Sequence, residues 1–130
     1  MALPVDPADP GFGKIEHRAA FAQFLEFLKP NLAGQTAIRV DPDWASQSKI
    51  IEGFAEFALP DRLIRDKTLN AELAELAQTA GIEDVPPLSP APAFGDVALA
   101  DIYDAEIEKL ARAAYGRDYL LFGFEDWNAA

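Results

Sequence analysis

The chain has 130 residues, of which 50% are hydrophobic and 25% charged, and its formal net charge is −11. A chain of this length buries about two-thirds of the surface that its unfolded form exposes, so it can form a hydrophobic core without covalent cross-links. The absence of cysteine excludes disulfides, thiolate metal sites and a cysteine nucleophile. The 22 acidic and 11 basic residues disfavour nucleic-acid binding, because a polyanion requires clustered Lys and Arg.

The sequence predicts neither a membrane span nor a targeting segment. Its apolar runs are short and interrupted by charges, far below the roughly 20 residues of a membrane helix. The first residues lack the basic and apolar regions of a signal peptide. We therefore expect a cytoplasmic protein, folded as a single domain over residues 1–130. The acidic excess is expected to serve solubility, and the alternative is an acidic patch that meets a basic partner.

The N-terminal part of the chain predicts an extended arm followed by a helix. Prolines at positions 4, 7 and 10 disfavour regular structure over residues 1–14. Apolar residues then recur at helical spacing over Glu16–Lys29, and Pro30 is expected to end this helix. The recurring residues are Phe21, Phe24, Leu25 and Leu28. We expect this face to lie in the core.

The next stretch predicts a short strand and then a candidate binding site. Residues Thr36–Val40 are rich in β-branched side chains, which favours a strand, and Asp41-Pro42-Asp43 favours a bend. Trp44 and Gln47 would share one face of a helical turn, where an aromatic plate beside an amide could form a small binding ledge. The preferred alternative is that Trp44 closes the core.

Two short segments of mixed character follow. Apolar residues at near-helical spacing predict a helix over Ser48–Phe57, although Gly53 weakens it, and Pro60 marks a break. Arg62 and Arg65 bracket two apolar residues. We expect these guanidinium groups to pair with Asp61, Asp66 or nearby glutamates, and the alternative is that they hold an anion.

The C-terminal half predicts two helices around a proline-rich loop. Asn70 can cap a helix that Gly81 ends, and prolines predict a crossover loop over residues 84–100. Asp101 can cap a helix over Ile102–Ala114 that ends at Gly116. The aromatic tail after it, residues 119–124, is expected to pack against the core. The predicted fold class is mainly α with one or two short strands.

Several passages, taken in order, resemble the C-terminal part of carbohydrate-type sulfotransferases, which transfer a sulfuryl group from the nucleotide PAPS. Phe21, Phe24 and Leu25 resemble an F-x-x-F-L helix. Residues 43–47 (DWASQ) are similar to H-W-x-P-Q, and residues 61–69 (DRLIRDKTL) to D-F-I-G-R-x-E-x-L. The end of the chain is similar to Y-x-x-D-x-x-x-F-G-Y, here Tyr115, Asp118, Phe122, Gly123 and Phe124. The resemblance implies the C-terminal portion of an α/β, P-loop-like fold.

The resemblance carries some family positions and departs at others. The family pattern has His, Pro, Gly and an acidic residue where this chain has Asp43, Ser46, Ile64 and Lys67. The retained positions are Trp44, Gln47, Asp61, Arg65, Leu69, Tyr115, Asp118, Phe122 and Gly123. Among these, Trp44, Gln47 and Arg65 are the candidates for a substrate-side or structural role, and no catalytic residue is assigned.

The resemblance implies an enzyme whose reacting groups lie outside this sequence. Sulfuryl transfer needs cations and amides around the phosphosulfate, and a base for the acceptor hydroxyl. In the resembling family the phosphate loop and the Arg/Ser pair that hold PAPS lie upstream, and neither occurs here. We expect the acceptor-side and packing half of such an enzyme, inactive alone and binding no cofactor itself. Its partner would be a nucleotide-binding portion. The alternatives are a non-catalytic helical interaction module, which docks on a protein partner, and an unrelated small helical enzyme.

Overall fold

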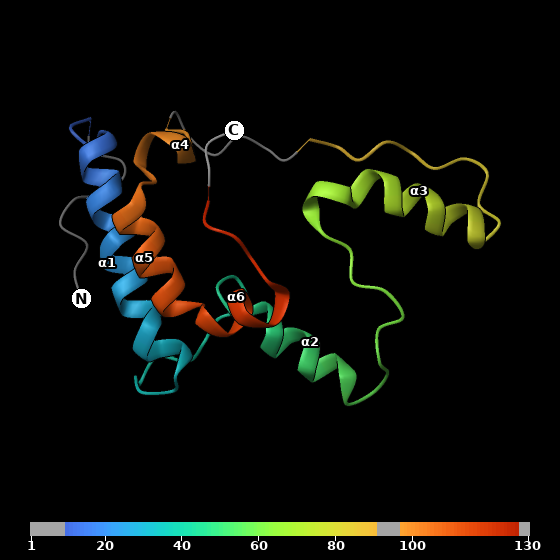
Figure 1. Ribbon diagram of the computed structural model, residues 1–130. Coiled ribbons are helices and arrows are strands. Elements are labelled where there is room, and N and C mark those ends of the chain that lie inside the picture. The colour runs from blue at the N-terminus through green and yellow to red at the C-terminus, as the bar shows by residue number, and fades with distance from the viewer. Residues whose placement is uncertain (1–9, 91–96, 128–130) are drawn as a thin grey trace. The chain divides into compact units, whose positions relative to one another are not determined.

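The computed structural model describes residues 10–90 and 97–127, and all regular structure within these ranges is helical (Figure 1). The α-helices are α1 (Lys14–Leu32), α2 (Gln47–Ala55), α3 (Leu69–Thr79), α4 (Leu99–Ile102), α5 (Ala105–Ala114) and α6 (Gly116–Phe122). A short 3₁₀ helix over Asp66–Thr68 precedes α3. The mainly α prediction is confirmed. The predicted strands are wrong for the described part of the chain.

The chain divides into two compact units by its contacts. The core unit comprises Met1–Gly53 and Phe94–Ala130, and the middle unit comprises Phe54–Ala93. Such a division does not test whether the chain folds as one domain, so the single domain stays a prediction. The predicted arm over residues 1–14 lies largely outside the described residues, as does the middle of the predicted crossover loop over residues 84–100.

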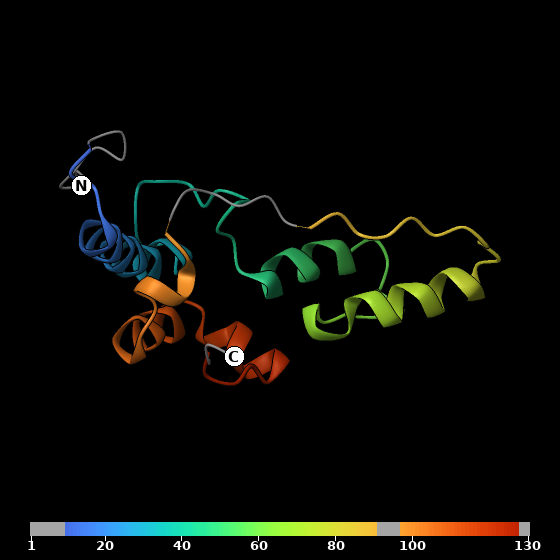
Figure 2. The same cartoon turned by 90° about the horizontal axis from the view of Figure 1, so that it is seen from above.

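Helices α1 and α5 pack side by side and form the hydrophobic core of the core unit (Figures 1 and 2). Leu25 and Leu28 of α1 meet Ile107 and Ala111 of α5, and Ile107 has no exposed surface. These residues stand at i, i+3 and i, i+4 spacings, which place them on one face of each helix. The predicted core face of the first helix is therefore confirmed.

Helix α1 continues past Pro30, where the sequence predicted its end. Proline lacks an N–H and disrupts a helix interior, but here it lies in the last turn, where few further ladder bonds depend on it. The next residue, Asn31, is buried and ties the helix end to the chain that follows. Its Nδ2 donates to Thr36 Oγ1 at 2.9 Å and to the Ile38 carbonyl at 2.7 Å.

These bonds also explain why Thr36–Val40 is not a strand. A strand needs a neighbouring strand to accept and donate its backbone hydrogen bonds, and the described residues contain none. The Ile38 carbonyl accepts from the side chain of Asn31 instead. The predicted bend after it is confirmed, because the Asp41 carboxylate accepts from the Asp43 amide at 3.0 Å.

The predicted helix over Ile102–Ala114 is interrupted at Tyr103 and Asp104. The Asp104 carboxylate caps α5 by accepting from the amides of Glu106 and Ile107 at 3.1 and 3.0 Å. The Ile107 amide is the main reason why the pKa of Asp104 lies below its usual value. Asp101, the predicted cap, accepts from the Ala98 amide at the start of the short α4. The predicted cap was therefore three residues too early for the main helix.

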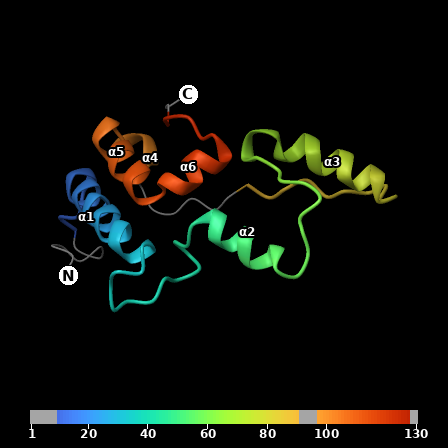
Figure 3. The ribbon, with the colours of Figure 1, turned by 60° about the horizontal axis from the view of Figure 1, so that its bottom comes forward.

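The C-terminal tail forms a further helix, which is visible in Figure 3 as α6 directly after α5. Gly116 begins this helix instead of ending the chain's last one, and Gly123 ends it at a φ of 62°, a backbone conformation that favours glycine. Leu120 and Leu121 are 83% and 57% exposed. The prediction that the whole aromatic tail packs against the core is therefore wrong at these two residues.

The middle unit contains α3 and very little core. Helix α3 begins at Leu69, so the predicted cap Asn70 lies inside it, whereas Gly81 follows its end with a φ of 74°, as predicted. Ala77 is its only buried residue among those described. Arg62 pairs with Glu75 at 3.3 Å, which confirms that this guanidinium group meets a nearby glutamate.

Candidate functional site

The candidate residue Trp44 lies in a turn between α1 and α2, where it packs on the core. Its ring meets Phe24 edge to face, with centroids 5.8 Å apart, and its Nε1 donates to Asn31 Oδ1 at 3.1 Å. Asn31 is 1% exposed, so this bond satisfies a buried acceptor. The position of Trp44 is that of a residue which closes the core.

The second candidate, Gln47, begins α2, and its backbone meets a buried carboxylate. Asp118 of α6 is 3% exposed and accepts from the amides of Gln47 and Ser48 at 2.8 and 3.0 Å. A carboxylate at this place satisfies two helix N–H groups and opposes the positive end of the helix dipole. Asp118 therefore caps α2 from a distant part of the sequence. Trp44 precedes the helix, so the predicted shared helical face is wrong.

Tyr115 connects the same two regions of the chain. Its hydroxyl donates to the Trp44 carbonyl at 2.8 Å, and burial followed by the charge of Asp118 raises the pKa of this tyrosine. Arg117 of α6 also pairs with Glu52 of α2. We call Asn31, Trp44, Gln47, Tyr115 and Asp118 the junction, because their bonds hold α1, α2 and α6 together.

The third candidate, Arg65, belongs to the middle unit. Its carbonyl accepts from the Thr68 amide at 3.0 Å, at the start of the 3₁₀ helix. Trp44 and Gln47 therefore belong to one bonded cluster of the core unit, and Arg65 belongs to the middle unit.

A buried glutamate in the core unit was not predicted from the sequence. Glu108 is 7% exposed and accepts from the hydroxyls of Tyr103 and Tyr119 at 2.5 and 2.8 Å. Burial is the main reason why the pKa of each tyrosine is raised, and the bond to Glu108 adds to it. Arg112 lies 3.9 Å from the carboxylate and 4.2 Å from the Tyr119 ring centre. The i, i+4 spacing of Glu108 and Arg112 was the one available sequence signal.

The Glu108 carboxylate has a structural role. Both of its oxygens accept a tyrosine hydroxyl, so each is already engaged within the core unit. A general base must reach a proton of a bound substrate. The Tyr–Glu–Tyr arrangement instead satisfies a buried charge, which would be costly without partners.

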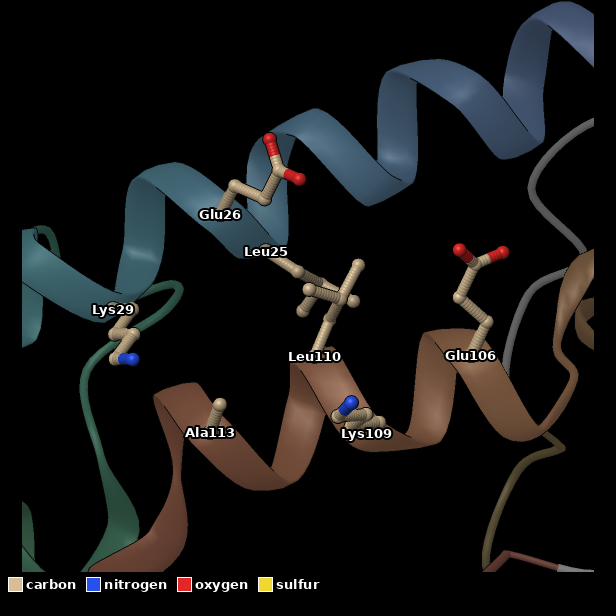
Figure 4. Close-up of a pocket in the computed structure, with 7 residues that line it drawn as sticks. All are labelled: Leu25, Glu26, Lys29, Glu106, Lys109, Leu110 and Ala113. Carbon is tan, nitrogen blue, oxygen red and sulfur yellow. The ribbon is translucent and has the colours of Figure 1, made fainter.

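An open groove runs between α1 and α5, with a volume of about 440 Å³ (Figure 4). Leu25, Leu110 and Ala113 form its apolar part, and its rim carries Glu26, Lys29, Glu106 and Lys109. Figure 4 shows these charged side chains on both helices, around the two leucines. The groove can hold an apolar group between charges of both signs. Its lining residues include no Ser, Thr or His.

No group of three His, Asp or Glu residues within residues 10–90 and 97–127 could hold a metal ion. In the same ranges, no helix combines the length and the apolar character that a membrane crossing requires. The chain matches no known family model, no curated protein and no solved structure.

Proposed function

We propose that this chain is the acceptor-side and packing part of a cytoplasmic, PAPS-dependent sulfotransferase of the carbohydrate type. In this proposal a nucleotide-binding portion outside the chain supplies the groups that hold PAPS. The whole enzyme would transfer a sulfuryl group to an acceptor hydroxyl. The chain alone would hold two of the passages that carry the resemblance, residues 43–47 and the one that begins at Tyr115, in one scaffold.

The junction is the observation that supports this proposal. Trp44 and Gln47 belong to the similar passage over residues 43–47, and Tyr115 and Asp118 belong to the last one. Although about 70 residues separate them, these passages meet through two hydrogen bonds of 2.8 Å, and the amide of Ser48, the next residue, adds a third to Asp118 at 3.0 Å. If the family pattern reflects one packed structure, its retained positions should be in contact even where they lie far apart in the sequence.

The departures from the family pattern agree with this interpretation. Asp43, Ser46, Ile64 and Lys67 differ from the pattern, and none of them supplies a bond between the two passages. The retained carboxylate and hydroxyl supply all three of those bonds. The proposal therefore rests on the side chains whose chemistry the contact requires.

The scaffold role also limits what the chain can do by itself. Stabilising the leaving phosphate of PAPS requires preorganised amides and cations. The junction directs its two helix amides at Asp118, so they are not available to an anion. We expect no PAPS chemistry from the chain alone.

Titration calorimetry with PAP, the desulfated nucleotide, tests the proposal in two stages. The chain alone should release no binding heat, and micromolar affinity would contradict the scaffold role. The nucleotide-binding half of a carbohydrate sulfotransferase is then added, and sulfuryl transfer from PAPS to a panel of hydroxyl acceptors is measured. Activity that appears with the chain and disappears with Asp118→Ala supports the proposal. An in-frame phosphate loop in the DNA upstream of the Met1 codon would support it independently.

The second candidate function is a non-catalytic helical interaction module. The observation that favours it is the exposure of Phe54, Phe57 and Leu59, at 70%, 90% and 80%. Large apolar side chains exposed next to one another are characteristic of protein interaction sites. A stop codon directly upstream of Met1, together with no activity in the two-part assay, would favour this function.

A further inference from the structure

The segment over residues 54–64 exposes four large apolar side chains, three of them by 70% or more. Phe54, Phe57, Leu59 and Leu63 are 70%, 90%, 80% and 54% exposed. All of them belong to the middle unit. Fully burying each side chain would contribute roughly 1.5 to 3 kcal/mol. We call residues 54–64 the docking segment.

The backbone of the docking segment is open after its first turn. The amides of Phe57 and Ala58 bond to the Phe54 carbonyl at 3.0 and 3.1 Å, which ends α2. From Leu59 to Ile64 no backbone–backbone hydrogen bond joins the segment to any other described residue. Pro60 lies within this stretch and has no N–H to donate. The side chains are therefore carried by the end of α2, the turn after it and a stretch without regular structure.

The charges on either side of Phe57 and Leu59 are acidic. Glu56 and Asp61 are the charged residues from Phe54 to Asp61, and neither forms a salt bridge with another described residue. The next charge, Arg62, is engaged by Glu75. A second copy of the chain would add another net charge of −11, which opposes self-association. A basic partner would meet the two carboxylates with favourable energy.

We propose that the docking segment binds a different protein through an apolar surface that Lys or Arg residues border. Phe57 and Leu59 enter the apolar surface, and Glu56 and Asp61 face the surrounding cations. Aromatic and leucine side chains supply the buried area, while the charges set the choice of partner. This inference is independent of sulfuryl transfer, because no residue of the junction takes part.

A designed peptide can represent the partner surface. We would use a fluorescently labelled amphipathic helix of Leu and Lys, which has an apolar face bordered by ammonium groups, and measure binding to the full chain by anisotropy. The expected result is saturable binding, which the double substitution Phe57→Ser and Leu59→Ser weakens by about tenfold or more. The Glu56→Lys and Asp61→Lys variant should weaken it by a similar factor. A helix of Leu and Glu should not bind.

The matched control removes equally exposed apolar residues elsewhere. Ile15 and Leu120 are 81% and 83% exposed, and both lie in the core unit. Replacing both by Ser leaves the net charge unchanged and should leave the affinity unchanged. Circular dichroism should show the same helix content for all variants, because each altered residue is exposed.

Four outcomes would overturn the inference. The first two are that the Leu and Lys peptide does not bind, or that its affinity does not change when Phe57 and Leu59 are replaced. The third is that the Ile15 and Leu120 control loses as much affinity. The fourth is that sedimentation velocity shows a dimer which the Phe57 and Leu59 substitutions dissociate. The last outcome would assign the surface to a second copy of the chain. The PAP titration is unaffected by any of them, so the two proposals can fail separately.

Discussion

The core unit and the middle unit are both helical, but they differ in how many of their residues are buried. The core unit buries Leu28 and Ile107 almost completely, along with polar groups such as Asn31 and Asp118. The described middle unit buries Ala77 alone, although α3 has as regular a helical pattern as α1. Helical periodicity therefore predicts where a helix forms, but not how much of it is buried.

The two units should respond differently to substitution. A helix of about a dozen residues is marginal in water by itself, so most of its stability comes from packing. The core unit supplies that packing through α1, α5 and the buried hydrogen bonds. Substitutions should therefore be costly there and mild in the middle unit.

The largest effect is expected at alkaline pH, because all 3 tyrosines of the chain lie in the core unit. Burial raises the pKa of Tyr103, Tyr115 and Tyr119 in the folded state above the ordinary value of 10. The neutral hydroxyls therefore stabilise the fold below pH 10, and this contribution is lost as the pH rises through the higher folded values.

A pH titration that follows tyrosinate absorbance in the ultraviolet and helix content by circular dichroism measures this loss of stability. We expect the tyrosines to ionise in the same step in which the helices melt. Independent ionisation near pH 10 with the helices intact would contradict the buried arrangement around Glu108.

The next largest effect compares two leucines on two helices. Leu28 is 1% exposed and Leu76 is 43% exposed. Leu28→Ala should lower the free energy of unfolding by about 2 to 5 kcal/mol, because it leaves a cavity between α1 and α5. Leu76→Ala should lower it by less than about 1 kcal/mol. Urea denaturation measures both, and equal losses would remove the distinction between the units.

Asp118→Ala should have an intermediate effect. The substitution leaves the buried Ser48 amide and the Gln47 amide without their carboxylate, which costs about 2 kcal/mol for charged hydrogen bonds of this kind. Asp61→Ala is the control, since that carboxylate is exposed and forms no salt bridge with a described residue. A loss of equal size at both positions would mean that charge alone, and not the cap on α2, is responsible.

A smaller effect is expected from the indole N–H of Trp44. Trp44→Phe keeps an aromatic ring beside Phe24 but removes the donor to Asn31 Oδ1, so it should cost about 1 kcal/mol. Trp44→Ala should cost more, because it also removes the packing. An unchanged melting temperature for Trp44→Ala, with loss of acceptor binding, would instead favour a binding ledge.

The sequence predicted the elements that are defined by residues close to one another in the chain. The spacing of Phe21, Phe24, Leu25 and Leu28 predicted the core face of α1, and Gly81 marked the end of α3. Asp41 and its proline predicted the bend. Each of these depends on residues within a few positions of one another.

The contacts that the sequence did not predict join residues that lie far apart in the chain. Asp101 and Asp104 are equally good helix caps by type, and Asp104 also pairs with Arg18 of α1 at 2.8 Å. Thr36–Val40 needed a partner strand that the described residues do not contain. Of the candidate site, Trp44 was placed correctly against the core, but no local pattern joins Gln47 to Asp118.

The cap on α2 has a consequence for the order in which the protein is made. The amides of Gln47 and Ser48 precede Asp118 by 71 and 70 residues. A ribosome adds about 5 to 20 residues each second, so α2 emerges several seconds before its cap exists. Until then those amides bond to water, and closing so long a loop adds an entropic cost. The junction is thus a late event in synthesis, and a nascent chain stalled before residue 118 should present α2 with its first turn frayed.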